Sequence, residues 1–219
     1  MSVAIERYTG SGGADYHSRR AAGRSAAEQQ VRAVYFEGVT TASDVVLDFG
    51  CATGGILSSL PAAMRIGVEV SEVSSAEARK VLDRVVAHLD EIEDASIDVA
   101  ISFHALEHVP NPQAVLLGLR RVLRPSGRLR LIVPYENVLL NRQHRQWSAG
   151  DPDQHLFAWT PMALGNLLSV SGFRVEQAKC THWARPGRLG RLVGAEQARW
   201  FKAIRAGRLQ VVADARCAG

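Results

Sequence analysis

The segment Val45-Val46-Leu47-Asp48-Phe49-Gly50-Cys51-Ala52-Thr53-Gly54-Gly55 decides the fold of this 219-residue chain. Its first five residues form an apolar run that ends at a glycine, which is typical of a buried strand feeding a tight turn. Three glycines and two small residues lie in the six positions of the turn, so its backbone can approach a ligand without Cβ clashes. The segment therefore predicts a strand followed by a ligand-binding loop.

The rest of the chain alternates between apolar runs and helical spacings of apolar residues. Strands are predicted at 45–49, 66–70, 85–88, 97–102, 128–133, 173–180 and 208–213, and helices at 25–37, 111–124, 160–171 and 188–205. Such alternation favours an α/β fold, a single-domain, Rossmann-like, mainly parallel seven-stranded sheet with helices on both faces. Ligands of these sheets bind at the carboxyl ends of the strands, near the point where strand order reverses.

The predicted organisation has two parts. Residues 1–40 form an N-terminal leader and capping helix, and residues 41–219 form the α/β domain. Within the domain, 134–159 is a long polar segment over the sheet edge, which we interpret as a loop or lid. Residues 186–206 form a basic amphipathic helix before the last strand.

The charge of the chain is unevenly distributed. The 26 Lys and Arg against 22 Asp and Glu give a net charge of +4 and a pI of about 9.2, but residues 183–219 carry +6 and the first 182 carry −2. A nucleic-acid partner is therefore not expected. The basic helix 188–205 could lie on a membrane, but packing on the domain is favoured over membrane contact. Three dispersed cysteines, with no secretory signal or apolar span, predict a soluble cytoplasmic protein.

Two carboxylates limit the kinds of ligand that the loop can bind. Asp48 ends the first strand and Glu69 ends the second, where related folds place an acid on ribose hydroxyls. Ala52 replaces the middle glycine of a dinucleotide motif, and Asp48 would lie beside an anionic pyrophosphate. A sulfonium or ammonium ligand is therefore favoured over NAD.

Several motifs in this order resemble the class I S-adenosylmethionine-dependent methyltransferases of small-molecule type. They are Asp48-x-Gly50-x-x-Thr53-Gly54, Gly67-Val68-Glu69-Val70-Ser71, residues 97–109, Leu123-Arg124-Pro125-Ser126-Gly127, Thr160-Pro161 and Gly172-Phe173. The likeness covers about residues 43–181. Ala52 and Ser126 depart from the glycines usual at those places.

The resemblance implies S-adenosylmethionine as cofactor and a set of residues around it. The loop would contact the methionine part, Asp48 its amino group, and Glu69 the ribose. The remaining contacts implied are Val70, Leu89 and Asp90 at the adenine and Ser102, Phe103 and His104 between cofactor and acceptor, with Gly50, Cys51, Thr53 and Gly54 forming the loop.

Histidines are the candidates for acceptor chemistry. If the acceptor carries a proton, a general base is needed, and His155 is the first candidate and His144 the second. His104 and His108 are spaced as metal ligands can be, but no carboxylate-plus-histidine set completes them in the sequence. The segment Leu106-Glu107-His108 is therefore interpreted as structural, and no metal site is predicted.

Function is predicted as methyl transfer to oxygen or nitrogen of a small molecule, either a sugar intermediate or a secondary metabolite. The alternatives are an RNA or protein methyltransferase, a non-catalytic cofactor-binding module, and an oxidoreductase. The sequence after the fourth strand, Ser102-Phe103-His104-Ala105, lacks the base-methylation motif that a nucleic-acid enzyme would carry there. The oligomeric state is left open.

Overall fold

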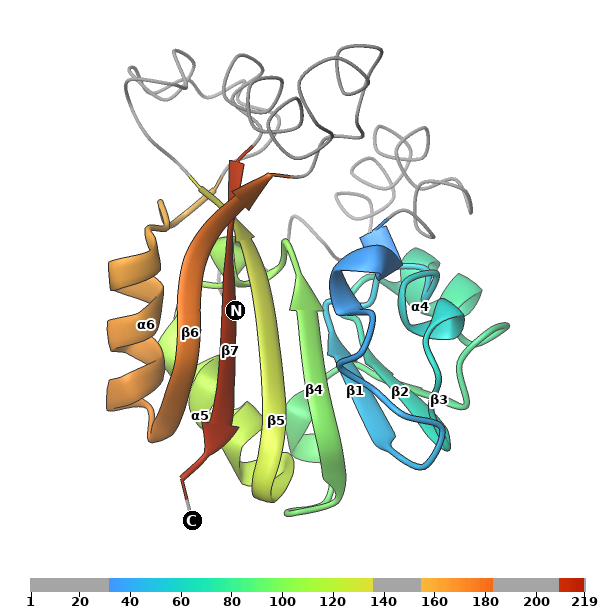
Figure 1. Ribbon diagram of the computed structural model, residues 1–219. Coiled ribbons are helices and arrows are strands. Elements are labelled where there is room, and N and C mark those ends of the chain that lie inside the picture. Colours follow the sequence, from blue (N-terminus) through green and yellow to red (C-terminus); the bar gives the residue numbers. More distant parts are fainter. Residues whose placement is uncertain (1–31, 136–154, 183–208, 219) are drawn as a thin grey trace, which may run out of the picture.

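The computed structural model describes residues 32–135, 155–182 and 209–218 (Figure 1). The leader, most of the expected helix 25–37, most of the expected lid including His144, and the expected helix 188–205 lie outside these residues. Their predicted roles therefore stay predictions.

Seven strands form one sheet in the order β3-β2-β1-β4-β5-β7-β6 (Figure 1). The strands are β1 (Val45–Phe49), β2 (Met64–Val68), β3 (Arg84–Val86), β4 (Ile97–Phe103), β5 (Leu123–Pro134), β6 (Phe173–His182) and β7 (Leu209–Cys217). Neighbours are parallel except β7, which is antiparallel to both β5 and β6. The mainly parallel seven-stranded α/β fold is confirmed.

Strand β5 begins earlier than the sequence predicts. Leu123 pairs with Ile97 of β4, the register then shifts, and Arg128 pairs with Val99. The Pro125-Ser126-Gly127 stretch, expected only to stop the preceding helix, forms this irregularity, and Ser126 has a φ of 62°. A bulge of this kind inserts unpaired residues without ending the strand.

Three α-helices lie in the described residues: α4 (Glu72–Ala78), α5 (Pro112–Val122) and α6 (Pro161–Val170). Asn111 caps α5 by accepting from the Ala114 amide at 3.0 Å, and Thr160 caps α6 through the Ala163 amide at 3.1 Å. Both helices match their predicted starts. Helix α4 was missed because its short Ser- and Glu-rich sequence carries no apolar stripe.

Alternate residues of the strands enter two apolar clusters, one on each face of the sheet. In β1, Leu47 joins the cluster that contains Leu116 of α5 and Leu164 of α6. Val46 joins the other cluster, which contains Ala78 of α4. Helices therefore cover both faces, as predicted. None of the helices in the described residues is both long and apolar enough to span a bilayer.

A charged network fastens β7 into the sheet and yields a stability prediction. The Arg130 Nη2 donates to Asp214 Oδ2 at 2.8 Å, and Gln177 donates to the same carboxylate. Burial alone would raise the pKa of Asp214, but the bonds from Arg130 and Gln177 outweigh it and lower the pKa. Asp214→Asn should therefore lower the free energy of unfolding by about 1–3 kcal/mol at neutral pH.

The depressed pKa also sets the pH dependence of that loss. The contribution of Asp214 is complete above its unfolded-state pKa and disappears as the pH falls through the lower folded-state value. Urea denaturation of Asp214→Asn and wild type at pH 7 and under acid conditions measures it. An undiminished difference in acid would contradict the assignment.

Candidate active site

The carboxyl ends of β1 and β4 lie side by side at the point where strand order reverses. After β3 the chain crosses to the other side of β1 and continues with β4. Asp48 is 2% exposed, and the Ser102 hydroxyl of β4 donates to the Phe49 carbonyl of β1 at 2.8 Å. This is the position at which open α/β sheets bind ligands.

The glycine loop is held close to the strands beside it. The amides of Gly50 and Cys51 both donate to the Val68 carbonyl, at 2.9 and 3.1 Å. Gly50 has a φ of 75°, and a Cβ placed on it would lie 2.5 Å from the Ala105 Cβ. Ala52 has a φ of 50°, in the left-handed region that favours glycine. This left-handed conformation explains why glycine is usual at the position of Ala52 in the family that the sequence resembles.

Glu69 connects the loop to the start of α4. Its Oε2 accepts from the Ala52 amide at 2.9 Å, and its Oε1 accepts from the Ser71 amide at 2.8 Å. A carboxylate offers about four lone-pair sites, which is more than two backbone amides occupy. The carboxylate is partly accessible and can also accept hydroxyl groups of a ligand.

The loop lies in a strongly acidic setting. Burial raises the pKa of Asp48 to about 7, and the nearby Glu69 carboxylate adds to the rise. The Glu69 and Asp48 carboxylates together disfavour a further negative charge here, and a cation that enters would stabilise their ionised forms. This electrostatic arrangement suits an ammonium or sulfonium ligand better than a diphosphate.

An aromatic group covers the end of β4. The Phe103 ring stacks with Tyr35 at a centroid distance of 6.2 Å, and the Arg32 guanidinium lies 5.6 Å from the same ring. His104 follows with a φ of 51°. Burial lowers the pKa of His104 to about 3, and the positive charge of Arg32 lowers it further. His104 is therefore a neutral imidazole at physiological pH.

The other loop residues named from the sequence lie nearby. Cys51 is buried, and a Cβ placed on Gly67 would lie 2.5 Å from its Sγ. Burial, with the charges of Asp48 and Glu69, raises the pKa of the Cys51 thiol well above its usual value, so it serves as packing. Gly54 is buried, while Thr53 and Val70 are partly exposed.

Leu89 and Asp90 have neighbours on α5. The Leu89 side chain would contact a Cβ placed on Gly118, and the exposed Asp90 lies 3.9 Å from Arg121. Their expected contact with adenine stays a prediction, as do the roles of the other cofactor residues.

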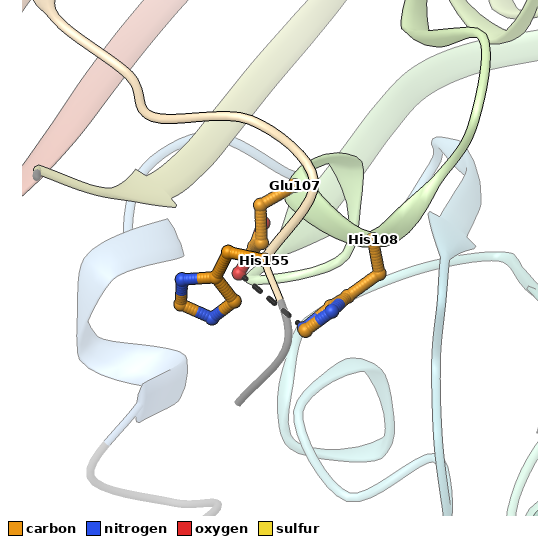
Figure 2. A group of neighbouring side chains, drawn as sticks. All are labelled: Glu107, His108 and His155. Atoms are coloured by element: carbon orange, nitrogen blue, oxygen red, sulfur yellow. Dashed lines mark ion pairs between the residues drawn. The ribbon is translucent and has the colours of Figure 1, made fainter. Parts of the chain in front are cut away.

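The structure brings His155 to Glu107 and His108, which are neighbours in the sequence (Figure 2). Glu107 and His108 belong to the 3₁₀ turn η5 (Leu106–His108) after β4, and His155 comes from the segment before α6. One ligand atom of each lies within 4.8 Å of the others. This group contains His108 but not His104, so the His104 and His108 pair considered from the sequence is not what the structure brings together.

The segment that carries His155 is anchored at both of its described ends. The Leu156 amide donates to the Glu107 carbonyl at 2.9 Å. Trp159 is buried and bridges to Tyr135, which follows β5. The expectation that residues 156–159 anchor His155 is confirmed for Trp159, whereas Leu156 is exposed. The second base candidate, His144, lies outside the described residues.

Comparisons with known proteins show the family to which the chain belongs. A family model described as a methyltransferase domain matches residues 21–178. The ubiquinone biosynthesis O-methyltransferase of Idiomarina loihiensis is 32% identical over 130 residues, which are 53% of this chain and 51% of that protein. The 27-O-demethylrifamycin SV methyltransferase of Amycolatopsis mediterranei is 38% identical over 104 residues, 41% of this chain and 38% of that enzyme. The chain thus matches about half or less of these curated relatives' length.

Solved structures share the fold. A SAM-dependent methyltransferase from Thermotoga maritima superposes with a TM-score of 0.65 at 20% identity and covers 97% of both chains. At that identity the likeness speaks for the fold alone. Together with the family model, which covers more than half of the chain, it shows that this protein belongs to the class I S-adenosylmethionine-dependent methyltransferase family.

Proposed function

We propose that this chain transfers a methyl group from S-adenosylmethionine to an oxygen of a small molecule, with nitrogen as the second choice of acceptor atom. The observation that carries the cofactor assignment is the pair of Asp48 and Glu69 beside the tight loop at the ends of β1 and β2. The curated relatives named above are O-methyltransferases, which favours oxygen.

The residues present fit this cofactor. Asp48 would hold its amino group, the backbone of Gly50 to Gly54 would pack against its methionine part, and Glu69 would accept its ribose hydroxyls. The bound cofactor supplies a methyl group on a sulfonium that is already activated for displacement. The chain then mainly aligns the acceptor and excludes water, and alignment alone supplies about 7–11 kcal/mol of a barrier.

A small-molecule acceptor is favoured over RNA or protein. The first 182 residues carry a net charge of −2, which gives no electrostatic attraction for a polyanion. The acceptor would enter beside His104 and His155, where the sequence places the acceptor side. His155 would take the acceptor proton if it acts as a general base. A reducing cytoplasm remains the expected location for the three free cysteines.

Calorimetry tests the cofactor assignment. Wild-type protein is titrated with S-adenosylmethionine, S-adenosylhomocysteine and NAD, and binding of the first two with none of NAD is expected. Turnover is then measured with hydroxylated and amine acceptors. Binding of NAD alone would refute the proposal, and cofactor binding without turnover on any acceptor would support a non-catalytic module.

Glu69→Gln should weaken S-adenosylmethionine binding by about tenfold, which is about 1.4 kcal/mol. The side-chain amide that replaces the carboxylate would place its NH2 group against a backbone N–H. It would also offer the ribose hydroxyls one acceptor oxygen fewer. Glu91→Gln is the matched control, since the Glu91 carboxylate also accepts two backbone amides, those of Ala87 and His88, at 2.9 Å. Equal cofactor affinity in Glu69→Gln and wild type would show that Glu69 only supports the loop.

A further inference from the structure

We infer that Gln210 binds the acceptor molecule, and that its carboxamide forms hydrogen bonds with an uncharged group that carries both a donor and an acceptor atom. A primary amide, a lactam or a hydroxyl beside a carbonyl fits this description. The inference rests on the proposed methyl transfer for the role of the ligand as acceptor. The site itself rests on the position of Gln210 in the fold and on its surroundings.

The strand order places Gln210 at the ligand-binding edge of the sheet. Because β7 runs antiparallel to β5, it begins where the parallel strands end, and Gln210 pairs with Pro134, the last residue of β5 (Figure 1). Strands β4 and β5 lie between β7 and β1. With neighbouring strands about 4.8 Å apart, Gln210 is about 14 Å from β1 across the sheet. Gln210 therefore lies beyond β4 as seen from Asp48, where an acceptor can bind beside the cofactor.

Gln210 is a neighbour of His104, which follows β4. Alternation along β7 gives Gln210 the same face as Val212, which belongs to the apolar cluster that contains Phe103. The His104 ring stacks on the Phe103 ring, with centroids 4.2 Å apart. The Gln210 carboxamide works against the lowering of the His104 pKa, as a hydrogen-bond acceptor close to the ring does. The carboxamide thus lies beside the imidazole at the end of β4.

The Gln210 carboxamide is buried without a completed hydrogen bond. The residue has no exposed surface. Neither its Oε1 nor its Nε2 has a hydrogen-bond partner in the part of the chain that the structure describes. Burying an amide in this way costs folding free energy, because water satisfies both of its polar atoms in the unfolded chain. A ligand that bonds to the carboxamide removes this cost, so the side chain is prepared for binding.

The chemistry of the carboxamide defines the group that it binds. It is uncharged, and it presents an acceptor oxygen and a donor NH2 on one planar unit. A neutral group with a donor and an acceptor side by side can therefore bond to both of its polar atoms. A charged group would lose its hydration at this buried position without a counter-charge from Gln210.

A ligand has a short path to Gln210. Pro134 and Thr181 flank it on the two neighbouring strands, and both are partly exposed. His104 is also partly exposed. A ligand that lies against His104 therefore reaches the carboxamide after a small movement of the side chains around it.

Gln210→Met tests the incomplete hydrogen bonding in the ligand-free protein. Methionine is close to glutamine in length and volume but has no amide, so the melting temperature should rise by about 2 °C or more. Gln177→Met in β6 is the matched control. The Gln177 carboxamide donates to Asp214, so its removal should lower the melting temperature.

Gln210→Leu, which has a different shape, guards against a packing defect specific to methionine. If the carboxamide were satisfied within the protein or by a permanently bound water, its loss would destabilise the fold. An unchanged or lower melting temperature in both Gln210→Met and Gln210→Leu therefore overturns the inference.

Calorimetry with a matched pair of probes tests recognition. Full-length protein loaded with S-adenosylhomocysteine is titrated with salicylamide and with phenol, which share a hydroxylated ring and differ in the neutral amide. Wild type and Gln177→Met should bind salicylamide at least tenfold more tightly than phenol, and Gln210→Met should lose this preference. Equal affinity for the two probes in wild type, absence of binding of both, or an unchanged preference in Gln210→Met overturns the inference.

Two outcomes separate this inference from the proposed function. Methyl transfer to hydroxylated acceptors without preferential binding of salicylamide refutes the role of Gln210 and leaves the proposed function standing. Preferential binding of salicylamide without methyl transfer to any acceptor refutes the proposed function, while the amide-binding site stands. The affinity for S-adenosylhomocysteine should be equal in Gln210→Met and wild type, and a tenfold loss would place Gln210 in the cofactor site and overturn its assignment to the acceptor.

Discussion

Asp48→Asn is expected to make the ligand-free protein more stable and its cofactor binding weaker. Burial and the Glu69 carboxylate raise the pKa of Asp48 to about 7, so ionising this side chain costs folding free energy. An amide carries no such cost. We expect the melting temperature of the ligand-free variant at pH 8 to rise by about 3 °C or more. We expect its affinity for S-adenosylmethionine to fall at least tenfold, because the amino group loses its counter-charge.

The sign of the pH dependence follows from the direction of the shift. The folded protein holds the Asp48 proton up to about pH 7, whereas the unfolded chain releases it near the ordinary aspartate pKa of 3.8. Stability of the wild type therefore falls as the pH rises between these two values, and is constant above. The melting-temperature difference between Asp48→Asn and wild type should grow across that window and then level off.

Asp98→Asn is the matched control. Asp98 also lies near one end of a strand, β4. Its carboxylate accepts hydrogen bonds from the Val45 amide at 2.8 Å and from Arg124. Burial tends to raise the pKa of Asp98, but these bonds and the nearby arginines outweigh that effect and lower the pKa. Asp98→Asn should therefore lower the melting temperature, whereas Asp48→Asn should raise it. If Asp48→Asn also destabilises the ligand-free protein, the ionised carboxylate contributes to the fold and the assignment of a ligand-directed charge is wrong.

Gly50→Ala is expected to be the most damaging small substitution in the loop. The new Cβ would lie 2.5 Å from the Ala105 Cβ, and the residue holds a φ of 75°. Left-handed backbone costs a non-glycine residue about 1–2 kcal/mol, and overpacking adds about 1–3 kcal/mol. We expect a loss of about 2–5 kcal/mol in the free energy of unfolding and a loss of cofactor affinity.

Gly38→Ala separates the two causes. Gly38 has nearly the same φ, 72°, but a Cβ on it would meet nothing within 4 Å. That variant reports the backbone cost alone, which should be about 1–2 kcal/mol. Adding Ala105→Gly to Gly50→Ala should recover the steric part in a double-mutant cycle measured by denaturant unfolding. Equal losses in Gly38→Ala and Gly50→Ala would remove the argument that the loop is in close contact with the turn after β4.

The order of the strands and of helices α5 and α6 could be predicted because each of these elements carries its own local sequence signals. Val45 to Phe49 is a run of five residues too short for a helix, and Asn111-Pro112 and Thr160-Pro161 carry both a cap and a first-turn proline. Helix α4 and the irregularity at Ser126 lack such signals, since Ser and Glu fit several local structures and a bulge depends on the neighbouring strand.

The side-chain cluster at η5 could not be predicted in the same way. Asp48 and Glu69 follow neighbouring parallel strands, so the sheet itself brings them to one edge. His155 lies beside Glu107 because the next residue, Leu156, donates its amide to the Glu107 carbonyl, and no periodicity encodes such a bond. The one available signal was the apolar stretch ending at Trp159, which marks an anchored segment but not the residues that it meets.

The antiparallel strand β7 also has a consequence for synthesis of the protein. Among the strands of the described residues, β6 pairs with β7 alone, and β7 pairs with both β5 and β6. While the ribosome has released the chain only as far as β6, that strand has no place in the sheet, and β5 presents an open edge. Unpaired edges invite pairing with other chains. The nascent protein is therefore most exposed to misassembly between the emergence of β6 and that of Leu209–Cys217, a span in which a chaperone would protect it best.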